Sequence, residues 1–302
     1  MLFRKNLKHR IIITSNCQTN GIADALQYLV NDESINIVPE WKIGHSAESF
    51  AQKNRELLVN STIWITSFPE DQIKAILPEN LSSGIKKIIR IPEIHFDAFH
   101  PDLTYIMGRE GILESPLVHY HSKIILLSFL EKLSVKKVMK LFNETLYNEL
   151  GYFDYWDQSI NRLKQDFLNS DLDYYKFIKL LNLDEIFMHS INHPNKEVLS
   201  TIAWLITNEL EDSPKIRNGG LKHILKDEIF EYGPVWPVYP EIATYYGNEG
   251  SYLFRAQGGK ILDLKEFIEA EYEIFSKQAQ NQFYEKSYYF SPEFVSAFQR
   301  NL

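Results

Sequence analysis

The first hundred residues alternate short runs of apolar, β-branched residues with segments of helical spacing. The short runs predict four buried strands, at residues 11–14, 35–38, 63–66 and 87–91. The segments between them predict helices, at residues 19–29, 47–59 and 71–77. Strands that alternate with helices are typical of βαβ units. We therefore expect a parallel sheet, whose ligands bind beyond the carboxyl ends of its strands.

Apolar residues at helical spacing dominate the middle of the chain, and the last third is richer in Gly, Pro and Tyr. The spacing predicts helices at residues 122–141, 158–168, 172–181, 195–210, 262–278 and 291–298. We expect an α/β protein with a parallel sheet core and a large helical portion over the carboxyl edge of the sheet. A single catalytic domain would span residues 1–302, with a sheet half (1–110), a helical half (111–230) and an aromatic-rich closing segment (231–302).

Composition narrows the class of protein. The single cysteine excludes an intramolecular disulfide framework and fits a reducing compartment. No apolar run is long enough for a signal-peptide core or a membrane span, which predicts a cytoplasmic protein without a transmembrane segment. The net charge of −8 argues against general nucleic-acid binding, which needs a basic surface.

Cys17 is the first candidate for chemistry. It follows the first predicted strand and precedes a predicted helix, which is where many α/β enzymes expose a nucleophile at a sharp turn. The positive end of the helix would lower the pKa of the thiol toward neutrality and favour the thiolate. The alternative interpretation is that Cys17 is a small buried hydrophobic residue.

His193 is the candidate general base. It stands before Pro194, which we expect at the first position of the following helix. The residue before a proline is held extended, so the imidazole orientation is restricted. A helix N-terminus also disfavours the imidazolium and keeps the ring able to accept a proton. Alternatively, His193 caps the helix or packs against the loop.

Histidines and carboxylates also gather after the fourth predicted strand. A metal site is one interpretation of this cluster, but the spacing is not that of a known ligand set, and we expect no metal. His100 and Asp102 are better interpreted as groups that shape or orient a site. Arg90, Arg109 and Lys123 are the cations best placed to meet an anionic ligand.

Four short motifs in this order resemble those of the WcbI family of polysaccharide-biosynthesis enzymes. The similarity covers roughly residues 11–267, and the family's usual glycine before the cysteine is Ser15 here. The motifs are Asn16-Cys17-Gln18, His100-Pro101-Asp102-Leu103, the segment 115–122 with Tyr120-His121-Ser122, and Asn192-His193-Pro194-Asn195.

The resemblance implies binding of coenzyme A or acetyl-CoA and O-acetyl transfer to a sugar or glycan hydroxyl, in capsule, exopolysaccharide or related glycan synthesis. It also implies a core related to the SGNH hydrolases, with cysteine in place of serine, and association with glycan-assembly enzymes. The expected roles are Cys17 as nucleophile and His193 as base, Asn16 and Gln18 at an oxyanion, His100 and Asp102 as shaping groups, and Arg90, Arg109, His121, Ser122 and Lys123 as contacts of coenzyme A.

Three alternatives stay open. Acetyl transfer could be direct, with His193 as base and Cys17 only lining the pocket. An SGNH-type esterase or deacetylase would use the same residues and accept water. A non-catalytic glycan-binding protein would use aromatic rings that stack on sugars. The candidate rings are Trp236, Tyr239, Tyr245, Tyr246 and Tyr252.

Overall fold

The computed structural model describes residues 9–30, 32, 34–42, 44–78, 84–108, 111–210, 233–278 and 286–302. The chain divides into two compact units, and each is assembled from separate stretches of sequence. Unit 1 comprises Met1–His95, Asn161–Leu183 and Asn192–Asp227, and unit 2 comprises Phe96–Ile160, Asp184–Ile191 and Glu228–Leu302. The single catalytic domain expected from the sequence stays a prediction.

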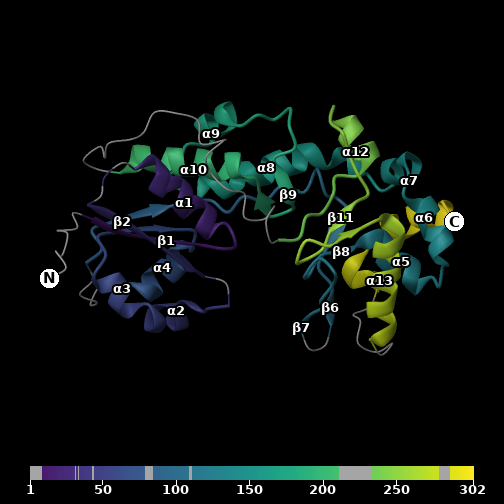
Figure 1. Ribbon diagram of the computed structural model, residues 1–302, viewed down its shortest axis with the longest axis horizontal. Coiled ribbons are helices and arrows are strands. Elements are labelled where there is room, and N and C mark those ends of the chain that lie inside the picture. The colour runs from purple at the N-terminus through teal and green to yellow at the C-terminus, as the bar shows by residue number, and fades with distance from the viewer. Residues whose placement is uncertain are drawn as a thin grey trace. The chain divides into compact units, whose positions relative to one another are not determined.

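Unit 1 is built on a parallel sheet of four strands in the order β2-β1-β3-β4 (Figure 1). The strands are β1 (His9–Ser15), β2 (Ile35–Trp41), β3 (Ile63–Thr66) and β4 (Lys87–Arg90). All four predicted strands and their parallel arrangement are confirmed, and β2 continues beyond the predicted end. The carboxyl ends of all four strands therefore meet at one edge of the sheet.

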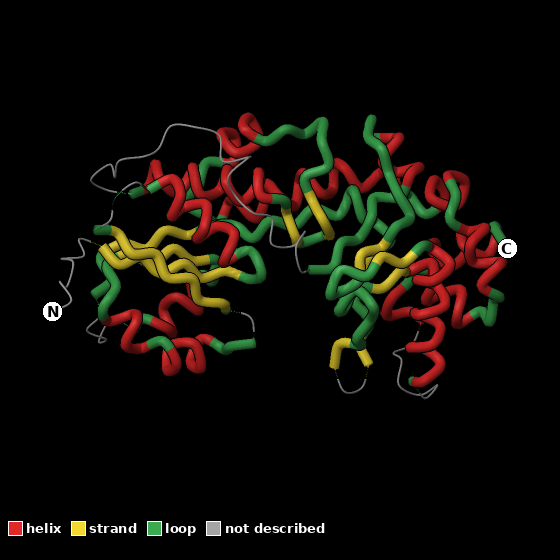
Figure 2. Tube along the Cα trace, in the orientation of Figure 1, coloured by secondary structure: helices red, strands yellow, loops and turns green. Residues whose placement is uncertain are grey.

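Helices cover both faces of this sheet (Figure 2). They are α1 (Thr19–Leu29), α9 (Tyr174–Leu180) and α10 (Lys196–Glu209) on one side, and α2 (Ala47–Lys53), α3 (Arg55–Val59) and α4 (Glu70–Ile76) on the other. Ile12 and Trp64 of the strands pack with Phe50 of α2 in a buried core. The predicted helix 47–59 is two helices, because the backbone leaves helical geometry at Asn54.

Unit 2 combines helices with pairs of very short strands. Its strands are β5 (Leu103–Thr104), β6 (Met107–Gly108), β7 (Gly111–Ile112), β8 (His121–Ser122), β9 (Met188–Ser190), β11 (Phe254–Arg255) and β12 (Ile261–Leu262). Its helices are α5 (Lys123–Leu130), α6 (Val135–Leu141), α7 (Glu144–Glu149), the 3-10 turn Tyr152–Asp154, α12 (Pro240–Tyr245), α13 (Leu264–Lys277), α14 (Lys286–Tyr289) and α15 (Pro292–Arg300). The range of α8 (Tyr155–Leu168) crosses the boundary between the two units.

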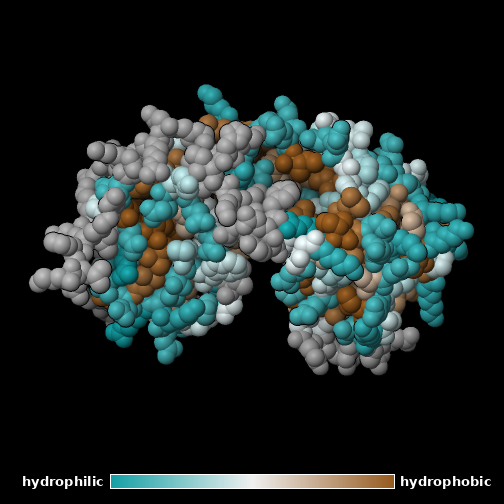
Figure 3. Space-filling model, viewed as in Figure 1, coloured by the Kyte–Doolittle hydropathy of each residue, from teal (hydrophilic) through white to brown (hydrophobic). Residues whose placement is uncertain are grey.

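The helical predictions in this part of the chain hold in outline. One is wrong in detail: the segment 122–141 is α5 followed by α6, because Lys132 adopts a left-handed backbone conformation with φ of 57° that ends a helix. The α/β class with a parallel sheet is confirmed, whereas a relation to SGNH hydrolases stays a prediction. Hydrophilic side chains cover much of the face shown in Figure 3. None of the described helices has the length and apolarity needed to cross a bilayer.

A buried chain of hydroxyl groups fixes the ends of the central strands. Thr14 donates a hydrogen bond to Oγ1 of Thr66 (2.7 Å) and accepts one from Nε1 of Trp64 (2.9 Å). Oγ1 of Thr66 also accepts from the backbone N–H of Phe68 (3.1 Å). Both hydroxyl groups lie where β1 and β3 end, so this chain sets the position of the residues that follow each strand.

Replacement of Thr14 by Val should therefore destabilise the protein. The change keeps the shape of the side chain but leaves the buried indole N–H of Trp64 without an acceptor. An unsatisfied buried donor costs about 1–3 kcal/mol of unfolding free energy. Denaturant unfolding measures the loss, and Thr201→Val on the half-buried side of α10 is the matched control, with an expected change within about 0.5 kcal/mol. Equal stability of the two variants would contradict this role of Thr14.

Candidate active site at the carboxyl edge of the sheet

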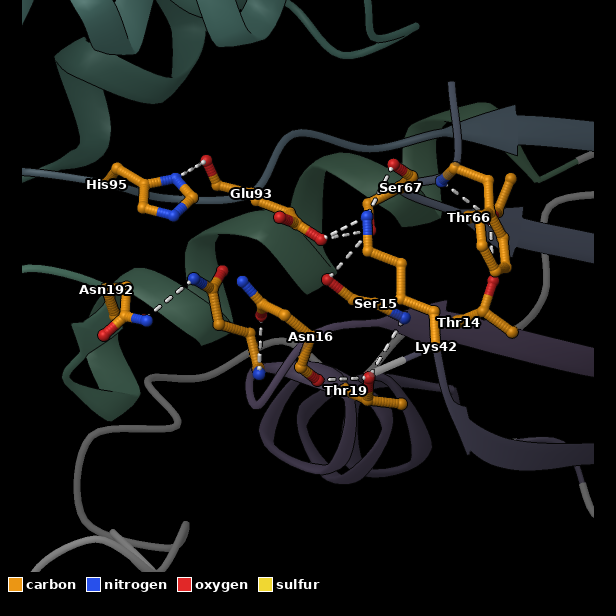
Figure 4. A network of polar contacts seen from close by, with 12 residues as sticks. Thr14, Ser15, Asn16, Thr19, Lys42, Thr66, Ser67, Glu93, His95 and Asn192 are labelled. Atoms are coloured by element: carbon orange, nitrogen blue, oxygen red, sulfur yellow. Dashed lines mark hydrogen bonds and ion pairs between the residues drawn. The ribbon is translucent and has the colours of Figure 1, made fainter. Parts of the chain in front are cut away.

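Thr19 holds the tight turn between β1 and α1 in place (Figure 4). Cys17 lies in this turn. Oγ1 of Thr19 accepts from the backbone N–H of Ser15 (3.0 Å) and donates to the carbonyl of Asn16 (2.7 Å). Oδ1 of Asn16 in turn accepts from the backbone N–H of Gln18 (3.0 Å). The side chains around it thus secure this turn without a glycine, and Cys17 stays partly exposed.

The side-chain amide of Gln18 joins three separate segments. Its Nε2 donates to the carbonyls of Ile94 (2.9 Å) and Asn192 (3.1 Å), and its Oε1 accepts from the backbone N–H of Ile94 (3.1 Å). Gln18 is buried, with 2% of its surface exposed. We call this set of three hydrogen bonds the Gln18 clamp. It holds the segments after β1, after β4 and before α10 together at the sheet edge (Figure 4).

The clamp also brings the His193 loop to the thiol. Sγ of Cys17 donates to the carbonyl of Asn192 at 3.8 Å, and His193 is the next residue along the chain. Asn195 caps α10 by accepting from two backbone N–H groups of its first turn. The expectation that Pro194 begins the helix is wrong: Pro194 precedes the cap, because the asparagine side chain satisfies the free donors instead. His193 and Pro194 form the short strand β10 (His193–Pro194). The segment 192–195 that carries His193, here called the His193 loop, is therefore held at both ends.

A second group of polar side chains lies at the same edge, and none of its members was a predicted site residue. Oε1 of Glu93 lies 2.6 Å from Nζ of Lys42 and accepts from the hydroxyl of Ser67 (2.8 Å). The hydroxyl oxygens of Ser67 and Ser15 are 3.2 Å apart, which links the group to the Cys17 turn (Figure 4). The sequence did hold a signal, since Lys42 and Ser67 directly follow β2 and β3, and Glu93 comes soon after β4.

Burial controls the charge of the thiol. Burial, and to a smaller extent the nearby carboxylate of Glu93, raise the pKa of Cys17 to about 12, against a lowering by a backbone hydrogen bond. The expectation of a lowered thiol pKa is therefore wrong, because loss of hydration outweighs the stabilisation by the turn and helix. At neutral pH the group is a thiol, which agrees with Sγ–H donating to Asn192.

The amide of Asn16 is the donor best suited to a developing negative charge. The backbone N–H of Gln18 is already bonded to Oδ1 of Asn16, and the Gln18 side chain is engaged in the clamp. Within the described part of the chain, nothing accepts from Nδ2 of Asn16. An oxyanion beside Cys17 would find this N–H group without a competing partner.

Comparison with known proteins identifies the family. The model of the polysaccharide biosynthesis enzyme WcbI matches residues 10–215, which is most of the chain. The chain belongs to the WcbI family. A solved structure of WcbI, described as a novel polysaccharide biosynthesis enzyme in its native form without a disulfide bond between COA and a cysteine, superimposes with a TM-score of 0.70. It is 13% identical in sequence, and the match covers 97% of this chain and 99% of that one, so the fold is shared. No curated protein matches.

The two remaining WcbI-like motifs meet in one buried network in unit 2. The carboxylate of Asp102 accepts four hydrogen bonds, which satisfy both of its oxygens. The donors are the hydroxyl of Ser122 (2.5 Å), the backbone of Ile124 (3.0 Å) and the hydroxyls of Tyr152 (2.9 Å) and Tyr239 (2.8 Å). A buried carboxylate persists only with such a set of donors, so this network is a folding element.

The histidines of these WcbI-like motifs are also internal. Nε2 of His100 bonds the carbonyl of Trp236 (3.1 Å), and burial lowers the pKa of His100 to about 3, which keeps it neutral. Nδ1 of His121 lies 2.7 Å from the carboxylate of Glu271, and its Nε2 lies 3.1 Å from the carbonyl of Leu113. The hydrogen-bond partners of both imidazole rings therefore belong to unit 2, as the two histidines do.

The predicted cationic contacts of coenzyme A have partners of their own. Nη2 of Arg90 lies 2.6 Å from Asp171, and Nζ of Lys123 donates to the carbonyl of Pro101 (2.7 Å). Arg109 lies outside the described residues. The structure thus gathers Asn16, Cys17, Gln18 and the His193 loop in unit 1, which also contains Arg90. The other described candidates lie in unit 2: His100, Asp102, His121, Ser122 and Lys123. Their roles stay predictions. No group of three or more candidate metal ligands occurs among the described residues.

Replacement of Glu93 by Gln should make Cys17 more reactive. Removal of the carboxylate charge favours the thiolate and lowers the pKa of Cys17, although burial still keeps it above the ordinary value. Because each pKa unit changes the thiolate fraction tenfold, alkylation by iodoacetamide at pH 8 should accelerate by about threefold or more.

Mass spectrometry follows this reaction cleanly, since Cys17 is the only cysteine. The wild-type rate should rise with pH without reaching a plateau at pH 10. Glu56→Gln, an exposed change on α3 of the same unit, is the control and should leave the profile unchanged. A Glu93→Gln profile that matches wild type would refute the electrostatic link.

Proposed function

We propose that this protein is a coenzyme A-dependent O-acetyltransferase that acetylates a sugar hydroxyl during polysaccharide biosynthesis, in a reducing cytoplasm. The observation that carries the proposal is the partly exposed Cys17 thiol at the carboxyl edge of a parallel sheet. The related WcbI structure is described as the native protein without a disulfide bond between COA and a cysteine, so its description names these two groups together. A disulfide needs two sulfurs to approach to about 2 Å. In this chain, Cys17 is the only cysteine that could approach coenzyme A in this way.

The residues around Cys17 fit the thioester end of acetyl-CoA. Nδ2 of Asn16 offers an N–H group to the carbonyl oxygen, whose negative charge grows as the carbonyl carbon is attacked. The Gln18 clamp keeps the turn and the His193 loop in fixed register around the thiol. Loss of one oxyanion donor typically raises the barrier by about 2.7–4 kcal/mol.

A covalent route accounts for the presence of a cysteine. His193 accepts the thiol proton, and the sulfur of Cys17 attacks the acetyl carbon. The bond from that carbon to the coenzyme A sulfur breaks, and the released sulfur takes the proton from His193. The sugar oxygen then attacks the acetyl carbon of acetyl-Cys17 while the neutral His193 accepts the hydroxyl proton. The bond from that carbon to the Cys17 sulfur breaks, and His193 returns its proton to this sulfur, which restores the thiol. With a thiol pKa near 12, only about one molecule in 10⁵ is thiolate at pH 7, so the base must act in the first step.

A direct route would use the same geometry. His193 would then deprotonate the sugar hydroxyl, which attacks acetyl-CoA while Cys17 only lines the pocket. The high pKa of the thiol is compatible with that passive role. Replacement of Cys17 by Ser distinguishes the two routes, because turnover near the wild-type rate would eliminate the covalent one.

Calorimetric titration with coenzyme A and acetyl-CoA tests the proposal. Saturable binding with a Kd in the micromolar range, about −8 kcal/mol, is the expected result. Cys17→Ala should retain binding within about tenfold and lose at least 10²-fold in acetyl transfer if the covalent route operates. Absence of binding at millimolar ligand, or release of acetate to water with no transfer to any sugar, would overturn the transferase and favour a hydrolase.

The identity of the base is tested by a matched pair of variants. His193→Gln should lower transfer by about 10²–10⁴-fold, as expected for loss of a general base. His95 lies on the segment after β4, where its Nδ1 is 3.3 Å from the carbonyl of Glu93 (Figure 4). His95→Gln should retain transfer within a few-fold. The reverse result would assign the base to His95.

A further inference from the structure

Four aromatic side chains form a surface cluster in unit 2, which we call the Tyr245 platform. Tyr245 is 61% exposed, and its ring packs against Phe153 and Tyr246 with centroids 4.8 and 5.1 Å apart. Tyr246 packs in turn against Trp156 at 5.0 Å. Phe153, Trp156 and Tyr246 are each half-buried. The result is a row of rings with one ring largely open to solvent.

The backbone beneath the platform is firmly held. Tyr252 donates to Glu241 of α12 (2.7 Å), and its hydroxyl lies 2.7 Å from that of Tyr147. Gly250 packs so tightly on α12 that an added Cβ would lie 2.6 Å from Cα of Pro240. Because these contacts fix α12, Tyr245 is held in place before any ligand arrives. A ligand that stacks on it has little ordering entropy to offset.

Carboxylates border the rings. Asp154 and Asp157 are exposed, and both act on the hydroxyl of Tyr246, whose pKa rises to about 12 mainly through burial. This hydroxyl oxygen is itself buried, and among the described residues it has no hydrogen-bond partner. The platform therefore combines flat apolar faces with strong hydrogen-bond acceptors, the two exposed carboxylates.

We propose that the Tyr245 platform binds an uncharged saccharide chain and serves as a subsite for the acceptor glycan. The apolar C–H face of a pyranose stacks on an aromatic ring, and its hydroxyls donate to carboxylates. The two aspartates disfavour a saccharide that carries its own carboxylates, because like charges repel across a partly desolvated contact. The role as acceptor subsite rests on the proposed function, whereas saccharide binding itself is measured without catalysis.

Calorimetry of the full chain with hexasaccharides tests this inference. The probes are neutral hexamers of glucose, mannose, galactose and N-acetylglucosamine, and an acidic hexamer of galacturonate. We expect at least one neutral probe to bind at least tenfold more tightly than the acidic one. Tyr245→Ala should weaken that binding by about tenfold, and Tyr245→Phe, which keeps the ring, should restore it to within about twofold of wild type.

Tyr288→Ala is the matched control, since Tyr288 is also 61% exposed and lies in the same unit. It should bind as wild type does. The joint change of Asp154 and Asp157 to Asn should narrow the preference for neutral over acidic probes. Three results would overturn the platform: no neutral probe binds, the acidic probe binds equally well, or Tyr288→Ala weakens binding as much as Tyr245→Ala.

The saccharide titration and the coenzyme A titration test the Tyr245 platform and the proposed function separately. If coenzyme A binds and no saccharide does, the platform is wrong and the transferase assignment stands. If saccharides bind through Tyr245 and coenzyme A does not, the platform stands as a glycan site and the transferase assignment fails. Thermal unfolding of Tyr245→Ala shows whether the variant remains folded, which the exposure of this side chain favours.

Discussion

The candidate site depends on one buried amide, that of Gln18. Each of its three hydrogen bonds contributes about 1 kcal/mol net, but loss of the side chain would also strand the buried backbone groups of Ile94. This side chain joins segments that the chain brings in from three different places. It fixes the Cys17 turn against Asn192, the residue before His193, and against Ile94, the residue after Glu93.

This arrangement also buries most of the Cys17 side chain, and burial determines how readily the thiol ionises. A thiol packed beside a carboxylate resists ionisation, so Cys17 rests in its neutral form. Lys42 holds Glu93 at 2.6 Å and Ser67 donates to it, which keeps the negative charge in one place. Under the proposed function, activation of Cys17 therefore requires a base that acts when substrate is bound. A site of this kind protects its cysteine from adventitious alkylation and oxidation until then.

The sequence predicted what depends on local pattern. Apolar periodicity predicts the four strands and places Cys17 at the end of the first one. The alternation of strands with helices predicts that the strands run parallel. The WcbI family also follows from four short motifs, and the family match confirms it. The sequence did not predict features that depend on contacts between residues far apart in the chain. The clamp joins Gln18 to partners 76 and 174 positions away, and nothing local indicates that its side chain turns inward.

The same limit explains the other differences. The thiol pKa was expected to fall because the turn and helix were the only visible influences, whereas burial and Glu93 come from the tertiary fold. The roles expected of His100, Asp102, His121 and Ser122 stay predictions, but the partners of these side chains could not be predicted from the sequence. In the structure, their hydrogen bonds stay within unit 2, where Asp102 alone accepts four. The residues of a short polar motif can thus take part in a buried hydrogen-bond network that their sequence does not indicate.

The most direct test of the account is the reaction of Cys17 with the disulfide of coenzyme A at pH 8.5. Exchange joins one coenzyme A to Cys17 through a mixed disulfide and releases the other as a thiol, so mass spectrometry gives the rate. Recognition at this site predicts that the rate saturates with reagent concentration and that acetyl-CoA competes. A rate that rises linearly, equals that of an unrelated small disulfide and ignores acetyl-CoA would contradict the assignment of Cys17 to a coenzyme A site.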